Sequence, residues 1–227
     1  VDVIEEKPIL KNFLIKLEKK TKNDFNNLNA LDEEFIDQMQ NFYFQEQKKY
    51  QKNKSSKIII DKLPLNIIHV GEILRFFPNA KFVFALRHPY DSVLSCFMQQ
   101  FILNPAMKNF LSIESSAFLY DLVMKLWTIY RETFSINFHV IKYEDIVSNF
   151  EKTTKEVFEY LDLDWTEQTK DFYLTAKNRI DISTPSYNQV TSPIYSKSMS
   201  RWKNYESHFK NSKEYLDKWV NQFNYKL

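Results

Sequence analysis

Two polar residues, Arg87 and Ser95, could bind an anion, and Asp91 stands midway between them in the sequence. The guanidinium of an arginine offers forked donors that suit a phosphate, and the free N–H groups and dipole at a helix N-terminus add to the same attraction. Arg87 beside a helix start would therefore form an anion site, toward which Ser95 could return its hydroxyl. On this stretch alone, an alternative stays open in which Arg87 only pairs with Asp91 and Asp91 caps the helix.

The elements that would position these residues are a strand and a helix. Residues 81–86 (KFVFAL) form a short apolar run rich in aromatic and branched side chains, which predicts a strand buried on both faces. Pro89 fits the first turn of a helix that we expect over residues 88–101. Arg87 would then lie at the carboxyl end of a strand, where open α/β sheets bind their ligands.

The pattern R-x-P-x-D-x-x-x-S after an apolar strand resembles the 3′-phosphate-binding segment of sulfotransferases that use 3′-phosphoadenosine 5′-phosphosulfate (PAPS). The resemblance implies that Arg87 and Ser95 bind the 3′-phosphate. Without it, both residues would remain candidates for an anion site of unknown purpose.

A second segment agrees with this family. Residues 58–60 (III) predict a buried strand that runs into Asp61-Lys62-Leu63-Pro64, followed by a helix over residues 66–76. This order is similar to that of protein-tyrosine sulfotransferases, whose lysine acts at the bridging oxygen as the sulfuryl group departs. The resemblance gives that role to Lys62, and a cation fits there because negative charge builds on the leaving phosphate.

The first ten residues, VDVIEEKPIL, resemble the acidic stretch of protein-tyrosine sulfotransferases, where the first of two adjacent glutamates is the catalytic base. Glu5 takes that place. A tyrosine hydroxyl has a pKa near ~10, so its attack on sulfur at neutral pH needs a base within hydrogen-bond reach. Taken alone, Glu5 and Glu6 would be a solvated helix start before Pro8.

Residues 137–142 (NFHVIK) predict a third buried strand, which ends at Tyr143-Glu144-Asp145. The family's Y-E-D segment places its tyrosine beside the adenine ring, and stacking on Tyr143 would give a flat base a polarizable partner. Tyr143 could equally be a core tyrosine. Further on, Asp162 replaces the glycine that is usual in the F-L-G-L-P-W segment of relatives.

Residues 181–200 contain two prolines and many Ser, Thr and Asn, a composition that predicts a loop. S-Y-N-Q-V followed by S-x-R-W-x-x-Y resembles the closing segment of bacterial sulfotransferases that carry tetratricopeptide repeats. On that resemblance Ser186 assists catalysis beside the sulfate, and Arg201 contacts the cofactor phosphates. Lys197 could serve instead of Arg201.

Amphipathic patterns predict further helices over residues 8–20, 32–49, 112–134 and 206–227. In the third of these we expect Phe118, Leu122 and Trp127 to face the core. The alternation of strands and helices predicts an α/β fold with a parallel sheet. By resemblance this is the P-loop NTPase-like sulfotransferase fold, a three-layer α/β/α arrangement in a single domain over residues 1–227.

The chain has one glycine, Gly71, and therefore no glycine-rich phosphate loop. The family's first strand and its 5′-phosphosulfate loop are expected to lie outside this sequence, which we interpret as an N-terminally truncated piece of a longer protein. The full-length protein could carry tetratricopeptide repeats, and the fragment alone could be inactive.

The composition limits which partners and cofactors we expect. A net charge of +2 does not indicate a basic face for nucleic acid. The sequence contains no run of about eighteen apolar residues, so no membrane span is predicted. The single cysteine, Cys96, predicts a buried structural thiol and suits a reducing compartment such as the cytoplasm. The four histidines lack ligand spacing, so no metal is expected.

We therefore expect a PAPS-dependent sulfotransferase whose acceptor is a tyrosine of a protein or peptide. Two alternatives stay open. The acceptor could be a glycan or a small alcohol, or the chain could be a module that binds a phosphorylated nucleotide without chemistry.

Overall fold

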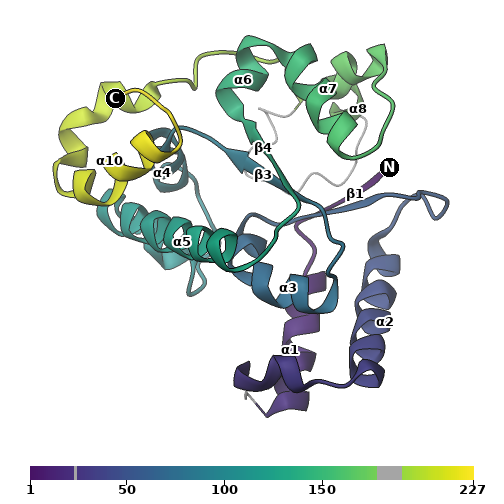
Figure 1. Cartoon of the computed structure of the whole chain (residues 1–227). Coiled ribbons are helices and arrows are strands. Elements are labelled where there is room, and N and C mark those ends of the chain that lie inside the picture. The colour runs from purple at the N-terminus through teal and green to yellow at the C-terminus, as the bar shows by residue number, and fades with distance from the viewer. Residues whose placement is uncertain (23–24, 178–190) are drawn as a thin grey trace. The chain divides into compact units, whose positions relative to one another are not determined.

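The computed structural model describes residues 1–22, 25–177 and 191–227 (Figure 1). These residues form two compact units, each with its own parallel strand pair. Unit 1 comprises Val1–Ala80 and Ile129–Ser135, and unit 2 comprises Lys81–Thr128 and Ile136–Leu227. We describe each unit by itself.

Unit 1 begins with a strand and alternates strands with helices. Its elements are β1 (Asp2–Glu5), α1 (Ile9–Thr21), η1 (Phe25–Ala30), α2 (Glu33–Tyr50), β2 (Ile59–Lys62), η2 (Pro64–His69) and α3 (Val70–Phe76). β1 and β2 are parallel, with Asp2 opposite Ile59 and Glu5 opposite Lys62. The two strands therefore end side by side.

Helices α1 and α2 lie side by side in Figure 1 and bury a shared apolar core. Phe13 is fully buried and packs edge-on against Phe76, with ring centroids 5.0 Å apart. The side chain of Asp32 accepts the N–H of Phe35 at 2.7 Å, which satisfies one of the free donors at the start of α2. The helices predicted over residues 8–20 and 32–49 are thus confirmed within one residue at each end.

Sequence reasoning missed strand β1. Its first residue, Asp2, is buried and accepts the backbone N–H groups of Lys52 and Asn53 at 2.6 and 3.0 Å. In the sequence, a charged residue at the start of so short an apolar run looks like a surface residue. In the structure, the two backbone N–H groups satisfy its carboxylate, and its pairing with β2 makes it the first residue of a strand.

Unit 2 holds the second strand pair and most of the helices. Its elements are β3 (Phe82–Leu86), α4 (Pro89–Phe97), η3 (Met107–Leu111), α5 (Ile113–Thr133, up to Thr128), β4 (Phe138–Lys142), α6 (Tyr143–Ser148), α7 (Phe150–Tyr160), η4 (Glu167–Asp171), α8 (Phe172–Lys177), η5 (Arg201–Ser212) and α10 (Lys213–Gln222). Strands β3 and β4 are parallel and pair from Phe82–Phe138 to Leu86–Lys142.

Two details of β3 and α4 correct the predictions. Val83 of β3 and Val140 of β4 are both 39% exposed, so these strands are not buried on both faces. Helix α4 ends at Phe97 and does not continue to Phe101. The N–H of Gln99 bonds the carbonyl of Cys96, only three residues back, which tightens the last turn and ends the helix.

The buried face of α5 differs from the predicted one. Phe118 and Leu122 are each 45% exposed, and the buried face instead follows Ala117, Asp121 and Met124. Asp121 tolerates burial because its carboxylate accepts the indole N–H of Trp219 at 2.8 Å and pairs with two lysines, Lys125 and Lys218. Only Trp127 of the expected stripe is buried.

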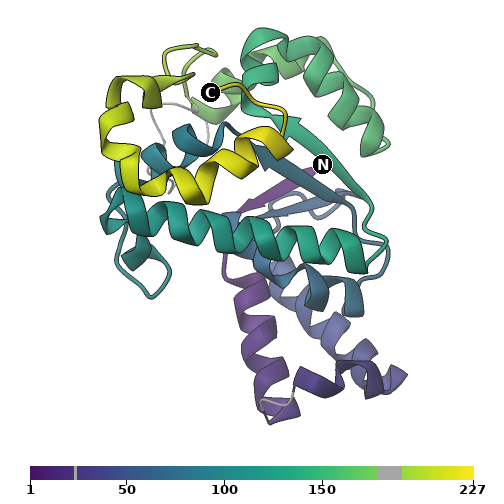
Figure 2. The same ribbon diagram turned by 60° about the vertical axis from the view of Figure 1, so that its left-hand side comes forward.

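The C-terminal residues belong to unit 2 and pack on its core. Figure 2 shows α10 in yellow running alongside α5 in teal. Leu216, Trp219, Val220 and Phe223 are buried, and a single core cluster joins Leu216 and Val220 to residues of α4 and η5. This core fixes the start of α4, where the candidate anion site lies.

Asp162, where glycine was expected, keeps a glycine-like backbone. Its φ is 56°, in the left-handed region that favours glycine, and it follows α7 directly after Leu161. Its carboxylate pairs with the ammonium of Lys81. The turn geometry is therefore preserved by an aspartate.

The α/β prediction is confirmed, with parallel pairing in both units. The hydrogen bonds form two two-stranded sheets in the described residues, where we expected a continuous sheet. That residues 1–227 form a single domain stays a prediction. None of the helices in the described ranges combines the length and apolar character needed to cross a membrane.

Candidate functional site

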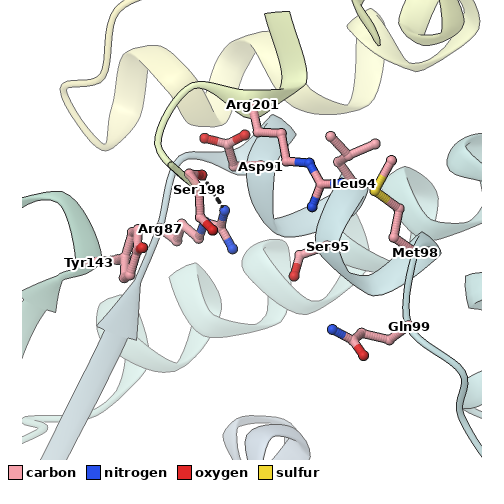
Figure 3. A pocket seen from close by; sticks show the side chains of 9 residues that line it. All are labelled: Arg87, Asp91, Leu94, Ser95, Met98, Gln99, Tyr143, Ser198 and Arg201. Atoms are coloured by element: carbon pink, nitrogen blue, oxygen red, sulfur yellow. Dashed lines mark hydrogen bonds between the residues drawn. The ribbon is translucent and has the colours of Figure 1, made fainter. Parts of the chain in front are cut away.

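A small cavity of about 60 Å³ lies in unit 2 at the carboxyl end of β3 (Figure 3). Its lining comes from the turn after β3, from α4, from the start of α6 and from the segment that leads into η5. The lining residues are Arg87, Asp91, Leu94, Ser95, Met98, Gln99, Tyr143, Ser198 and Arg201. Four of the five nucleotide-binding candidates, namely Arg87, Ser95, Tyr143 and Arg201, thus surround one cavity.

Arg87 is held from two sides. Its Nη2 donates to the carbonyl of Ser198 at 2.6 Å, and its guanidinium carbon lies 5.0 Å from the ring centroid of Tyr143. Its Nε is buried and has no hydrogen-bond partner among the described residues. A buried donor without a partner costs free energy, so an anion that accepted from Arg87 would be favoured.

Ser95 and Arg201 bring further donors to the same space. Figure 3 shows the Ser95 hydroxyl and the guanidinium groups of Arg87 and Arg201 around one opening. Cys96, the neighbour of Ser95, is no nucleophile candidate, because burial raises the pKa of its thiol to about 11. The cavity therefore offers two positive charges and a hydroxyl but no reactive thiolate.

Tyr143 and Lys197 take different places. Tyr143 lines the cavity, and its hydroxyl donates to the carbonyl of Tyr195 at 3.4 Å. Burial raises the pKa of this hydroxyl, which therefore stays protonated as a donor. Lys197 is exposed and does not line the cavity, so of the two basic candidates in this segment only Arg201 belongs to the site.

Asp91 does not cap α4, which corrects the helix-capping alternative. No side chain caps the start of this helix, and Asp91 Oδ1 instead accepts the backbone N–H of Trp202 at 2.8 Å. Asp91 is 1% exposed, and burial raises the pKa of its carboxyl group. It therefore connects the first turn of α4 to the residue that follows Arg201.

Glu144 ties the turn after β3 to the C-terminal residues. One of its carboxylate oxygens accepts the N–H of His88 at 2.9 Å, and the other accepts the hydroxyl of Tyr225 at 2.8 Å. The imidazole of His88 stacks on Trp202, with ring centroids 5.3 Å apart. These contacts fix the backbone of the turn that follows Arg87.

Glu5 and Lys62 come together in unit 1. They are paired residues at the ends of the parallel strands β1 and β2. Lys62 Nζ makes an ion pair of 2.8 Å with Glu6, and the N–H of Glu6 donates to the carbonyl of Lys62 at 2.8 Å. Glu6 has a φ of 54°, so the chain enters a left-handed turn directly after β1.

Asp61, just before Lys62, is also partly buried. Its Oδ2 accepts the hydroxyl of Tyr43 at 2.8 Å, and burial raises the pKa of its carboxyl group. Unit 1 therefore places two acidic residues, Glu5 and Asp61, within one residue of Lys62 in the strand register.

Ser186, the third catalytic candidate, lies outside the described residues, so its place is a prediction only. In the described part of the chain, no three His, Cys, Asp or Glu side chains are grouped as metal ligands would be.

The sequence matches the model of the Sulfotransferase family over residues 8–167, about 70% of the chain. The chain belongs to the sulfotransferase family. A protein of Aquifex aeolicus (strain VF5), described as uncharacterized, is 28% identical over 162 residues, or 66% of this chain. The chain spans about 19% of that relative's length.

Two solved structures share the fold of this sulfotransferase chain. The sulfotransferase domain from the curacin biosynthetic pathway aligns with a TM-score of 0.58 and 17% identity, over 93% of this chain and 78% of that one. The sulfotransferase STF9 from Mycobacterium avium aligns with a TM-score of 0.51 and 14% identity, over 88% of this chain and 49% of that one. The α/β sulfotransferase fold is thus established independently of the motifs.

Sequence reasoning missed the roles of three side chains that organise the candidate sites, namely Glu6, Glu144 and Asp91. Each stands inside a motif already singled out, next to a nominated residue or within the same spacing. The motifs therefore locate these residues in the sequence. They do not reveal the partners, because a partner such as Trp202 lies far along the chain from Asp91.

Proposed function

We propose that this chain is the part of a PAPS-dependent sulfotransferase that binds the nucleotide's 3′-phosphate and supplies an acid–base pair for sulfuryl transfer to a tyrosine hydroxyl. The observation that carries the proposal is the cavity at the end of β3. Two arginines, a serine and a tyrosine that were nominated from three separate motifs line it together.

The donors of the cavity fit a phosphate monoester. The guanidinium groups of Arg87 and Arg201 supply charge-assisted donors, and the partnerless Nε of Arg87 gains an acceptor when a phosphate oxygen binds. Ser95 adds a hydroxyl donor. Tyr143 offers an aromatic ring at the rim of the same cavity, where an adenine could stack.

The proposed chemistry assigns the proton transfer to Glu5. Its carboxylate takes the proton of the acceptor hydroxyl while that oxygen forms a bond to sulfur. The bond between sulfur and the bridging oxygen breaks, and its electron pair stays on the 5′-phosphate. The products are the sulfate ester and adenosine 3′,5′-bisphosphate. Lys62 stabilises the charge on the leaving oxygen, and Ser186 assists there.

The structure of unit 1 supports the assignments of Glu5 and Lys62, because both residues end paired parallel strands, where α/β proteins place their functional side chains. Glu6 supports the role of Lys62, since its carboxylate holds the ammonium of Lys62 at the end of β2. Tyrosine as the acceptor rests on the resemblance of the segments around Glu5 and Lys62.

The test is sulfuryl transfer from radiolabelled PAPS by the full-length protein to a tyrosine peptide, a glycan and a small alcohol in parallel. Since general-base catalysis contributes roughly 10²- to 10⁴-fold, we expect Glu5→Gln to lower kcat on the preferred acceptor by at least about a hundredfold. Affinity for adenosine 3′,5′-bisphosphate should not change.

The matched control is Glu33→Gln, which makes the same charge change at an exposed position at the start of α2. It should keep full activity. Nucleotide binding without transfer to any acceptor would support a non-catalytic module instead, and transfer only to the glycan or the alcohol would replace tyrosine as the acceptor class.

A further inference from the structure

Arg201 is carried by a short segment, residues 198–202, that is anchored on both sides of the cavity. On one side, the carbonyl of Ser198 accepts from Arg87 Nη2 at 2.6 Å. On the other, the N–H of Trp202 donates to Asp91 Oδ1 at 2.8 Å. Figure 3 shows Asp91 beneath this segment, between Ser198 and Arg201.

The backbone between the two anchors is strained. Ser200 has a φ of 53°, a left-handed conformation that costs a non-glycine residue free energy and persists only where its surroundings hold it. Trp202 is buried against Tyr90, with ring centroids 4.5 Å apart, but this packing fixes the side chain and leaves the backbone N–H to Asp91. The direction in which Arg201 leaves the segment thus depends on Asp91.

Asp91 is an unexpected lining residue for an anion site. A carboxylate repels a bound phosphate, and burying it also costs free energy. Its presence at 1% exposure therefore calls for a compensating gain. The hydrogen bond to Trp202 is such a gain, since it orders the segment that supplies the second arginine of the cavity.

We propose that Asp91 is a positioning residue, which strengthens the binding of a nucleotide's phosphate monoester by fixing residues 198–202 so that Arg201 faces the cavity. The inference rests on the proposed function. It makes a distinct claim, namely that the negative charge of Asp91 is dispensable and that its acceptor oxygen is not.

The test compares two substitutions of nearly equal size in the full-length protein. Asp91→Asn keeps an acceptor oxygen for Trp202 without the charge, whereas Asp91→Leu removes the acceptor. Because an ordered charge-assisted contact of Arg201 would be lost, we expect Asp91→Leu to weaken binding of adenosine 3′,5′-bisphosphate by about tenfold, and Asp91→Asn by no more than about twofold. Binding of 5′-AMP, which lacks the 3′-phosphate, should change by less than about twofold in both.

A double-mutant cycle with Arg201→Gln separates positioning from a general structural role. In the Arg201→Gln background, Asp91→Leu should add less than about twofold, because the residue through which it acts is already gone. Losses that multiply in the double mutant would overturn the proposal. So would an Asp91→Leu protein that binds as tightly as the wild type.

Asp217→Asn is the matched control. Asp217 accepts the hydroxyl of Tyr90 and so also ties the first turn of α4 to a distant element, but this hydrogen bond does not involve residues 198–202. This variant should bind both nucleotides as the wild type does. Hydrogen exchange should show faster exchange confined to residues 198–204 in Asp91→Leu.

The outcomes distinguish the inference from the proposed function. If the folded wild-type protein does not bind adenosine 3′,5′-bisphosphate, the proposed function fails. If the wild type binds it and Arg201→Gln weakens binding while Asp91→Leu does not, only the inference fails. If Asp91→Leu and Asp91→Ala both fail to fold, Asp91 supports the whole unit and the positioning role is overturned.

Discussion

Replacing Arg87 by glutamine should selectively weaken the binding of nucleotides that carry a 3′-phosphate. Glutamine lacks the positive charge, and its shorter side chain ends near the position of Arg87 Nε, so its amide does not reach the carbonyl of Ser198, which Arg87 Nη2 bonds at 2.6 Å. The substitution therefore removes the charged donors of the guanidinium, including the buried Nε that has no partner in the described residues, together with the contact to the backbone.

The expected size follows from those donors. Hydrogen bonds to a charged group contribute on the order of 2 kcal/mol, and 1.4 kcal/mol corresponds to a factor of ten, so the affinity should fall by roughly thirtyfold.

Titration calorimetry with adenosine 3′,5′-bisphosphate and with 5′-AMP is the appropriate assay, since only the first carries the 3′-phosphate. Lys197→Gln is the control, because it makes the same charge change in an exposed side chain that does not line the cavity. It should change either affinity by less than about twofold. Equal losses for both nucleotides in folded Arg87→Gln, or no loss for either, would refute the assignment of Arg87 to a 3′-phosphate.

Two further predictions concern stability. His88 Nε2 lies 3.1 Å from the carbonyl of Lys226 and its Nδ1 is buried without a partner in the described residues; burial lowers the pKa of the imidazole. As the pH falls below about 6.5, the unfolded chain binds this proton more readily than the folded one, so stability should decrease by up to about 1.4 kcal/mol per pH unit. His88→Gln should flatten that slope in urea titrations between about pH 7 and pH 5, and an unchanged slope would contradict the assignment. At the left-handed Asp162, glycine and alanine substitutions both lose the ion pair to Lys81, but only alanine strains the backbone. The free energy of unfolding of Asp162→Gly should therefore be about 1 kcal/mol higher than that of Asp162→Ala. Equal free energies of unfolding would show that the turn relaxes to accept alanine.

The nominated residues that line the cavity were predictable because they stand at or near the ends of helices and strands, where local sequence signals are strong. A hydrophobic run that stops at Arg87, and a proline two residues later, located the strand–helix turn to within one residue. Arg87, Ser95, Tyr143 and Arg201 then converge on one cavity, as the motifs implied. The role of Ser186 stays a prediction.

Where prediction failed, a polar residue was satisfied by a partner far along the chain. The buried face of α5 was misplaced because Asp121 counts as polar in any periodicity, although Trp219 and Lys218 make it a core residue. The same holds for Asp2, whose two backbone donors at Lys52 and Asn53 conceal a strand start. Hydrophobic periodicity depends only on side-chain type, and it carries no information about which donors form hydrogen bonds to a buried carboxylate.

Three carboxylates of unit 2, of which Asp91 and Asp121 are buried and Glu144 is half-buried, each accept a hydrogen bond from the C-terminal residues. Asp91 accepts from Trp202, Asp121 from Trp219, and Glu144 from Tyr225. Because removing a partner leaves the carboxylate unsatisfied, these bonds oppose displacement of residues 202–225 from α4, α5 and α6. The C-terminal residues therefore hold in place the backbone that carries Arg87 and Arg201. The donors of the cavity gain their preorganisation from acidic residues, and an anion that binds there need not supply the free energy to order them.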